Sequence, residues 1–276
     1  MNRFILSILL LTAILFFQHA HAATVDTISV YSPSMKKDLK CVVIKPAAYK
    51  KKKRHFPVVY LLHGYGGWYS NWLIRVPQLK EHADMLELMI VCPDGATSSW
   101  YYDSPADSTM RYETHVVNEI VPYVDAHYRT IASPNARAIT GLSMGGHGGI
   151  FLGLRHADVF GACGSMSGAV DVNTLRSKYE IMKLIGDTVV YAQRWKDHSV
   201  YYMVEQYAGT KQKIIFDCGT GDFFYESNRL LHEKLLKLKV EHDYIERPGK
   251  HDWDYWRNAV PYQLYYFYDY FKKSKT

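Results

Sequence analysis

Hydrophobic residues gather along the chain into short runs that predict strands, and stretches with helical spacing separate most of the later runs. Strands are predicted for residues 24–31, 39–45, 56–62, 88–92, 136–140, 159–165, 213–218 and 242–246. The first two runs are too close in sequence for a crossover helix between them, so we expect them to be antiparallel. Residues 56–62 (FPVVYLL) are almost continuously apolar, which is typical of a strand covered on both faces of its sheet.

Helices are predicted for residues 113–128, 144–156, 223–238 and 252–272. Val116, Ile120 and Val124 repeat at a spacing of four and so share one face of the first helix. One stripe of the third helix collects four leucines, Leu230, Leu231, Leu235 and Leu238. In the last helix, Pro261 predicts a kink or a break. Strands that alternate with helices in this way predict the α/β class, with a mostly parallel central sheet and helices on both of its faces.

Residues 169–211 interrupt this alternation, because they contain no clear strand. Their aromatic side chains argue against disorder, and include Tyr179, Tyr191, Trp195, Tyr201 and Tyr202. Since long insertions inside a compact domain are usually disordered or functional, we interpret this stretch as a partly helical insertion over the active site. No repeat and no Pro/Gly/Ser-rich linker divides the chain, so residues 23–276 are predicted to form a single domain.

The N-terminus has the order of regions that marks a secretory signal peptide. One positive charge at Arg3 precedes the apolar residues 4–17, and Ala20-His21-Ala22 follows as a small-residue cleavage site. The apolar stretch is shorter than the ~20 residues that a membrane span requires. We therefore predict cleavage near Ala22 and export to the periplasm or the extracellular space, and we expect no membrane partner afterwards.

Composition and charge add little to this picture. The hydrophobic content of 48% and the charged content of 22% are those of an ordinary globular protein. Much of the net charge of +6 comes from residues 50–54 (KKKKR), which we interpret as a solvated hairpin tip in preference to a site for a polyanion. No nucleic-acid-binding motif is present, and nucleic acid is not expected as a partner.

The four cysteines, Cys41, Cys92, Cys163 and Cys218, each lie in or at the end of an apolar run. Export would allow two disulfides, but this placement favours buried free thiols. No pair has the spacing of a zinc site.

The strongest chemical signal is the sequence Gly141-Leu142-Ser143-Met144-Gly145. It lies between the fifth predicted strand and the second predicted helix, which is the context of the nucleophile elbow of α/β-hydrolases. Glycines on both sides avoid a collision inside the tight turn, and the helix that follows directs its N-terminal dipole at the serine. The motif predicts Ser143 as a nucleophile.

A serine hydroxyl needs a base to take its proton, and in this fold the acid and then the histidine follow the serine in sequence. His251 lies just past the last predicted strand, where a loop can bring it over Ser143. His242 would sit at the wrong end of that strand, His147 lies on the helix after the serine, and His63 is interpreted as structural. We predict His251 as the base.

The carboxylate that orients the histidine is predicted to be Asp222, which follows the penultimate strand in Cys-Gly-Thr-Gly-Asp. Asp217 lies inside that strand and would point into the layers of the fold. Asp252 and Asp254 are too close in sequence to the histidine for the usual geometry. The alternative role for Asp222 is that of N-cap for the helix that begins at Phe223.

Two backbone N–H groups must stabilise the oxyanion of the tetrahedral intermediate. One is predicted to belong to Met144, directly after the nucleophile. The other should come from the glycine-rich loop after the third strand, HGYGG, with Tyr65 as the expected donor and Gly66 as the alternative.

These segments together resemble the Putative esterase family. The resemblance rests on YLLHGYGG, YETHVVNEIVPYV, RAITGLSMGG, CGTGD and GKHDWDYW, and it extends from about residue 60 to residue 256. The family includes feruloyl and acetyl-xylan esterases of carbohydrate esterase family 1, S-formylglutathione hydrolases and mycolyltransferases. It implies Ser143, Asp222 and His251 as the catalytic triad and Tyr65 as an oxyanion donor. The family varies most in the stretch that corresponds to residues 169–211.

The predicted export favours an ester met outside the cytoplasm, such as a feruloyl or acetyl group on a plant polysaccharide or oligosaccharide. Trp100, Trp253 and Trp256 are the expected substrate-binding side chains, because aromatic rings stack on sugars and on hydroxycinnamoyl groups. The alternatives are an S-formylglutathione hydrolase-like thioesterase or general short-chain esterase, an acyltransferase, and an inactive carbohydrate-binding protein. Neither a metal nor an organic cofactor is expected, since this mechanism needs only side chains and backbone amides.

Overall fold

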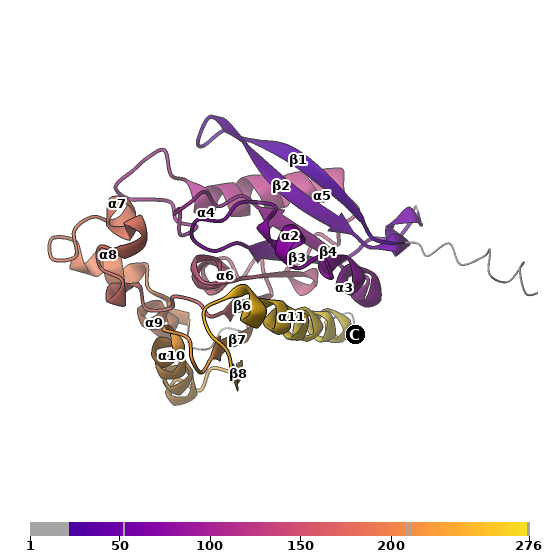
Figure 1. Ribbon diagram of the computed structural model, residues 1–276. Helices are drawn as coiled ribbons and strands as arrows, with labels where there is room; N and C mark the ends of the chain where they lie inside the picture. The colour runs from indigo at the N-terminus through magenta and orange to yellow at the C-terminus, as the bar shows by residue number, and fades with distance from the viewer. Residues whose placement is uncertain (1–21, 52, 208, 210, 275–276) are drawn as a thin grey trace, which may run out of the picture.

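The computed structural model describes residues 22–51, 53–207, 209 and 211–274. The predicted signal peptide therefore lies outside the described residues, except for Ala22. The eight strands form one sheet in the order β1-β2-β4-β3-β5-β6-β7-β8 (Figure 1). Their bounds are β1 Thr24–Ser32, β2 Lys37–Lys45, β3 Val58–Leu62, β4 Met89–Pro93, β5 Arg137–Gly141, β6 Ala162–Met166, β7 Lys213–Gly219 and β8 Asp243–Arg247.

The sheet is parallel from β4 onward and antiparallel at its beginning. β1 pairs antiparallel with β2, and β2 pairs antiparallel with β4. The later strands all pair in parallel. This is the mostly parallel arrangement that the sequence predicts, and it is the sheet of an α/β-hydrolase.

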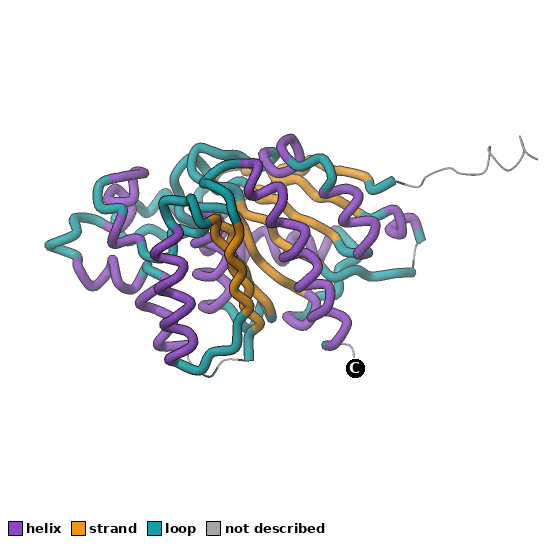
Figure 2. Tube along the Cα trace, turned by 60° about the horizontal axis from the view of Figure 1, so that its bottom comes forward, coloured by secondary structure: helices purple, strands orange, loops and turns teal. Residues whose placement is uncertain are grey.

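Helices cover both faces of the sheet (Figure 2). On one face lie α5 Val121–His127, α6 Met144–Arg155 and α10 Tyr225–Lys237. The other face is covered by α3 Leu79–Leu86 and α11 Trp253–Lys273. Along β3, the side chains of Val58, Tyr60 and Leu62 pack on the first face, and those of Val59 and Leu61 pack on the second. The continuous apolar run of this strand thus reflects burial on both faces.

The predicted helix at residues 113–128 contains an unexpected π-helical segment. It consists of α4 Tyr112–Thr114, a π-helix over His115–Ile120, and α5. Pro122 lies two positions after the last residue of the π-helix, at the beginning of α5. Because proline has no N–H to donate and its ring crowds the preceding turn, we attribute the wider turns to this residue. The predicted apolar face is nevertheless buried.

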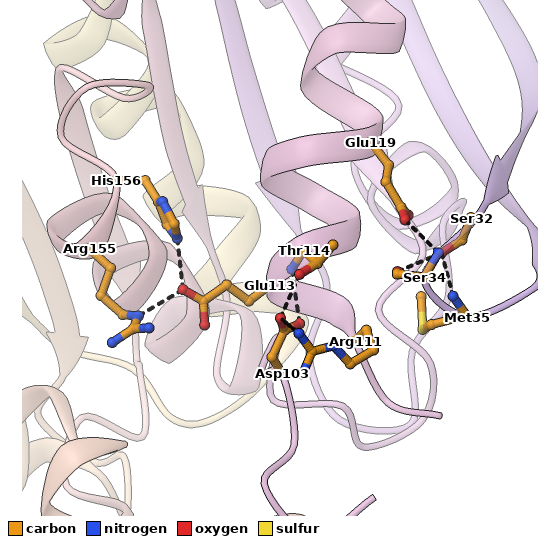
Figure 3. A network of polar contacts seen from close by, with 10 residues as sticks. All are labelled: Ser32, Ser34, Met35, Asp103, Arg111, Glu113, Thr114, Glu119, Arg155 and His156. Carbon is orange, nitrogen blue, oxygen red and sulfur yellow. Dashed lines mark hydrogen bonds and ion pairs between the residues drawn. The ribbon is translucent and has the colours of Figure 1, made fainter. Parts of the chain in front are cut away.

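Carboxylates attach this helical segment to its surroundings at three places (Figure 3). The carboxylates and their partners are Glu113 with Arg155 and His156, Asp103 with Arg111 and Thr114, and Glu119 with Ser34. The segment is thereby attached to the end of α6, to the loop after β4, which carries Asp103, and to the β1–β2 turn. These contacts hold the loop after β4, which carries Trp100, in a defined position.

Two local predictions are wrong. Residues 50–54 are no hairpin tip, because β4 lies between β2 and β3 in the sheet. In α10, Leu231 and Leu235 are buried, but Leu230 is 38% exposed and faces outward. Of the kink or break predicted at Pro261, the break is absent, because α11 runs through this residue. Two helices that precede β4 were not predicted from the sequence, namely α2 Asn71–Arg75 and α3.

The stretch at residues 169–211 forms several short helices, among them α7 Ile181–Ile185, α8 Ala192–Asp197 and α9 Val200–Met203. α7 and α8 project away from the sheet at the left of Figure 1. The four cysteines are buried free thiols, as predicted. No helix among the described residues is long and apolar enough to span a membrane.

A buried carboxyl group joins β7 to α11. The Tyr255 hydroxyl donates a hydrogen bond to Asp217 Oδ1 (2.9 Å), and Gln263 Nε2 donates one to Oδ2 (2.7 Å). The side chain of Asp217 therefore points into the layers of the fold, as expected from its place in the strand. Burial raises the pKa of this carboxyl to about 6, although the two hydrogen bonds oppose the shift.

We expect the free energy of unfolding to contain a component from Asp217 that is lost as the pH rises through about 6. The folded state keeps the proton up to that pH, whereas the unfolded state loses it near the ordinary pKa of an aspartate, about 3.9. The difference corresponds to about 3 kcal/mol between pH 4 and pH 7. Urea unfolding at several pH values gives the free energy of unfolding of the wild type and of Asp217→Asn. The difference between the two proteins isolates the contribution of Asp217, because the other titrating groups contribute equally to both proteins. Two parallel curves of stability against pH would contradict the assignment.

Candidate active site

Ser143 stands at the sharp turn between β5 and α6, with φ 55° and ψ −114°. A positive φ is strained for a residue with a side chain, and such strain often marks a functional position. A Cβ atom on Gly141 would lie 2.6 Å from the Gly145 carbonyl oxygen, and one on Gly145 would lie 2.5 Å from the His63 carbonyl oxygen. Both glycines are therefore required by close backbone approach, and the turn has the conformation of a nucleophile elbow.

Ser143, His251 and Asp222 form a hydrogen-bonded row. His251 Nε2 lies 2.9 Å from Ser143 Oγ, and His251 Nδ1 lies 2.8 Å from Asp222 Oδ2. The carboxylate accepts the Nδ1–H, which leaves Nε2 as the acceptor for the serine hydroxyl. The side chain of Asp222 is fully buried, and that of His251 is 14% exposed. This arrangement can move a proton from the serine to the imidazole and stabilise the resulting imidazolium.

Two loops bring the acid and the histidine together, although 29 positions separate them. Asp222 follows β7, and His251 follows the neighbouring strand β8. The Gly221 N–H donates to the Gly249 carbonyl oxygen (2.9 Å). A Cβ atom on Gly219 would lie 2.5 Å from the same oxygen, so the two loops pack backbone against backbone.

Asp222 orients the histidine but is not the N-cap of the following helix, because α10 begins at Tyr225 and has Phe224 as its N-cap. Asp222 Oδ1 accepts a hydrogen bond from the Phe224 N–H (2.8 Å). Its Oδ2 accepts from His251. Among the other aspartates, Asp252 caps the N-terminus of α11, and Asp254 pairs with Arg257 at the surface.

The side chains of the other three histidines considered above make their hydrogen bonds in other parts of the fold. His63 is buried, and its ring nitrogens contact the Gly64 carbonyl oxygen (2.9 Å) and the Gly95 N–H (2.7 Å). It thus ties the loop after β3 to the loop after β4. His147 is buried against Tyr102 and the Ala169 carbonyl oxygen, and burial lowers its pKa to about 3. His242 contacts His232 at the far end of β8.

The backbone N–H groups of Tyr65 and Met144 have no hydrogen-bond partner among the described residues. The Gly66 N–H donates to the Thr97 carbonyl oxygen (2.8 Å) and is therefore engaged. Of the two donors considered for the loop after β3, only that of Tyr65 is available. Free N–H groups beside a serine are the arrangement that an oxyanion hole requires.

The serine opens into a cavity of about 290 Å³. Its lining includes the three tryptophans that the sequence singled out, Trp100, Trp253 and Trp256. Sequence reasoning did not identify the remaining large side chains of the lining, Trp68, Asn71, Arg75, Leu142, Phe223 and Phe224. Phe223 could have been inferred, because it directly follows Asp222, and its ring lies 4.3 Å from that of His251. The insertion contributes Tyr179.

No group of three or more His, Cys, Asp or Glu side chains in the described ranges is arranged to hold a metal ion.

Known proteins resemble this chain over most of its length. The Putative esterase family matches residues 32–267. An acetyl esterase from Caldicellulosiruptor saccharolyticus is 27% identical over an alignment of 252 residues, and the alignment covers 84% of this chain and 94% of that protein. The diacylglycerol acyltransferase/mycolyltransferase Ag85A of Mycobacterium leprae is 26% identical over 269 residues, with 84% of this chain and 79% of that protein covered.

A solved structure of a ferulic acid esterase has the same fold. It superposes with a TM-score of 0.78 at 27% identity and covers 90% of this chain and 98% of its own. The family match includes the serine turn and the two loops that carry Asp222 and His251. The chain therefore belongs to the Putative esterase family and has its α/β-hydrolase fold.

Proposed function

We propose that this protein is an exported serine carboxylesterase that removes acetyl or feruloyl groups from plant polysaccharides or oligosaccharides. Ester hydrolysis itself is supported by the family and by the related acetyl esterase. The observation that carries the serine mechanism is the row of hydrogen bonds from Asp222 through His251 to Ser143, beside two unpaired backbone N–H groups.

In the acylation step, His251 Nε2 takes the proton of Ser143 Oγ while that oxygen attacks the ester carbonyl carbon. The carbonyl oxygen becomes an oxyanion, to which the N–H groups of Tyr65 and Met144 donate. Asp222 keeps the imidazole in the required tautomer. The carbon–oxygen bond to the alcohol then breaks, His251 gives its proton to the departing alkoxide, and an acyl-serine remains.

In the deacylation step, water takes the place of the alcohol. His251 accepts a proton from the water, whose oxygen attacks the acyl-serine carbonyl carbon. The same N–H groups stabilise the second oxyanion. When the bond to Ser143 Oγ breaks, His251 returns the proton to the serine, and the carboxylic acid leaves.

The choice of acyl group and alcohol rests on the cavity and on the relatives. Aromatic side chains dominate the lining, and their faces suit both a hydroxycinnamoyl ring and the apolar face of a sugar. The similar proteins named an acetyl esterase and a ferulic acid esterase act at the two acyl groups proposed. The predicted signal peptide motivates a substrate outside the cytoplasm.

We expect methyl ferulate or acetylated xylan to be hydrolysed with a higher kcat/KM than S-formylglutathione. The aromatic lining favours an acyl ring or a sugar, whereas S-formylglutathione has neither: its acyl group is a formyl group and its thiol portion is a tripeptide. A panel of acetyl, butyryl, feruloyl and S-formylglutathione substrates, assayed on the pure protein, gives the ranking. A higher kcat/KM for the thioester would contradict the proposed substrate class and favour the thioesterase alternative.

An acyltransferase is the second candidate, because the Ag85A protein named above is 26% identical. In that case a bound sugar or lipid hydroxyl replaces water in the deacylation step. Product analysis with an added sugar acceptor distinguishes the two activities, since a transferase forms a new ester where a hydrolase forms free acid.

A further inference from the structure

Contacts between the lining side chains divide the cavity into two sides. On one side, the Trp100 indole N–H donates to the Tyr179 carbonyl oxygen (3.2 Å), and the Tyr179 ring packs against that of Tyr65. On the other side, Arg75 at the end of α2 lies over the Trp253 ring, with 5.9 Å between the guanidinium carbon and the ring centroid. Trp68 and Asn71 belong to this second side. We call it the Arg75 side.

Arg75 is a cation without a countercharge. It is exposed, it lines the cavity, and none of the described lining residues is acidic. No ion pair joins it to a carboxylate of the described residues. The acidic residue at the beginning of α11, Asp254, is already paired with Arg257 (3.0 Å). Arg257 also donates from Nε to the Arg75 carbonyl oxygen (3.2 Å), which holds the end of α2 in place.

An unpaired guanidinium in a binding cavity suits a carboxylate on the ligand. Its planar fork of N–H donors matches the two oxygens of a carboxylate, and such charge-assisted hydrogen bonds are stronger than neutral ones. The neighbouring Trp68 is 46% exposed and offers a ring of the kind that stacks on a sugar. A sugar with a carboxylate, a uronic acid, combines the two kinds of contact.

The position of the proton donor indicates which part of the ester meets Arg75. His251 protonates the alcohol as it leaves, so the alcohol must lie against this side chain. From His251, aromatic contacts lead in two directions. One reaches Phe223 (4.3 Å between ring centroids), and the other passes through Trp256 (4.9 Å) to Trp253 (5.4 Å), which lies beneath Arg75. An alcohol portion that follows the second direction extends into the Arg75 side.

We infer that Arg75 makes this enzyme prefer esters whose alcohol portion carries a carboxylate, which in a polysaccharide is an acylated, uronic-acid-containing chain. The inference rests on the esterase function proposed above and specifies its substrate class. Arg75 is a specificity-determining residue in this account and takes no part in the bond-breaking steps.

A matched pair of small esters tests the preference. The probes are 4-acetoxybenzoate, whose alcohol portion carries a carboxylate, and 4-acetoxybenzamide, which has the same shape without the charge. Arg75→Gln is expected to lower kcat/KM for the benzoate by about tenfold to a hundredfold, and to change that for the benzamide by less than about twofold. Arg75→Lys keeps a positive charge but lacks the planar fork of N–H donors, so its kcat/KM for the benzoate should fall by less than that of Arg75→Gln. The quantity compared between the wild type and each variant is the ratio of kcat/KM for the benzoate to kcat/KM for the benzamide. In this comparison the difference in intrinsic reactivity between the two esters cancels.

The control is Lys178→Gln, which removes a cation beside a neighbouring cavity and outside the lining described above. It should leave the ratio unchanged. A second pair, the 4-nitrophenyl monoester of succinic acid and the 4-nitrophenyl ester of succinamic acid, places the charge on the acyl portion. An equal ratio in the wild type and in Arg75→Gln would overturn the inference, and so would an effect confined to the succinyl pair. If the wild type does not hydrolyse the benzamide at all, the proposed esterase function itself is contradicted. This result differs from an unchanged ratio, which contradicts only the role of Arg75.

Discussion

Ser143→Ala is expected to lower kcat for ester hydrolysis by about 10⁶-fold, as removal of the nucleophile does in other serine hydrolases. The expectation follows from the 2.9 Å contact between Ser143 Oγ and His251 Nε2, because no other hydroxyl lies at the imidazole among the described hydrogen bonds. Water cannot take over the role of the serine at a similar rate. Some acceleration over the uncatalysed reaction should remain from the two backbone N–H donors.

The measurement combines steady-state hydrolysis of a feruloyl or acetyl ester with labelling by a fluorophosphonate probe. Ser165→Ala is the matched control, since this serine is buried on β6 and its hydroxyl has no partner among the described residues. The wild type and the control should be labelled, and Ser143→Ala should not. Labelling that survives in Ser143→Ala would identify another nucleophile, and an unlabelled wild type would favour the inactive, carbohydrate-binding alternative.

Asp222→Asn is expected to lower kcat by about 10⁴-fold while the fold is retained. The amide keeps the size of the carboxylate, and its oxygen can still accept the hydrogen bond from the Phe224 N–H. The amide NH₂ would then face His251 Nδ1 and favour the tautomer in which Nε2 carries the proton. That tautomer cannot accept the proton of Ser143, and the imidazolium loses its countercharge.

Two aspartates supply controls for this variant. Asp254→Asn removes a surface carboxylate in the first turn of α11. Among the described residues, this carboxylate forms an ion pair only with Arg257. Asp217→Asn removes a buried carboxyl group that contacts Tyr255 and Gln263. Both should keep kcat within about tenfold of the wild type, with thermal unfolding as the check on folding. A greater loss in Asp217→Asn than in Asp222→Asn would contradict the assignment of the acid.

The agreement between predicted and observed elements is best where one local signal decides the structure. Apolar runs placed the central strands β3 to β7 to within a few residues, because a parallel strand buried on both faces has almost no polar positions. The prediction failed where distant partners decide. The π-helix depends on how Pro122 is accommodated in a packed helix. The false hairpin at residues 50–54 depends on β4, which inserts between two strands that are consecutive in sequence.

The sequence by itself determined the order and the type of the reacting groups in this protein. Glycines at 141 and 145 are needed by the turn they occupy, and the positions after two successive late strands singled out Asp222 and His251. The reason is that the ends of parallel strands meet at one edge of the sheet, so residues just beyond them must lie close together.

Only the tertiary structure decided what surrounds these groups. Which N–H groups are free depends on Thr97, which engages Gly66 from another loop. The cavity is assembled from six separate segments of the chain, and Arg75 enters it from a helix that was not predicted from the sequence. Its lack of a carboxylate partner is a property of side chains remote in sequence, such as the pairing of Asp254 with Arg257. Local sequence thus specifies the chemistry of the serine, whereas packing between distant segments shapes the space in which a substrate must fit.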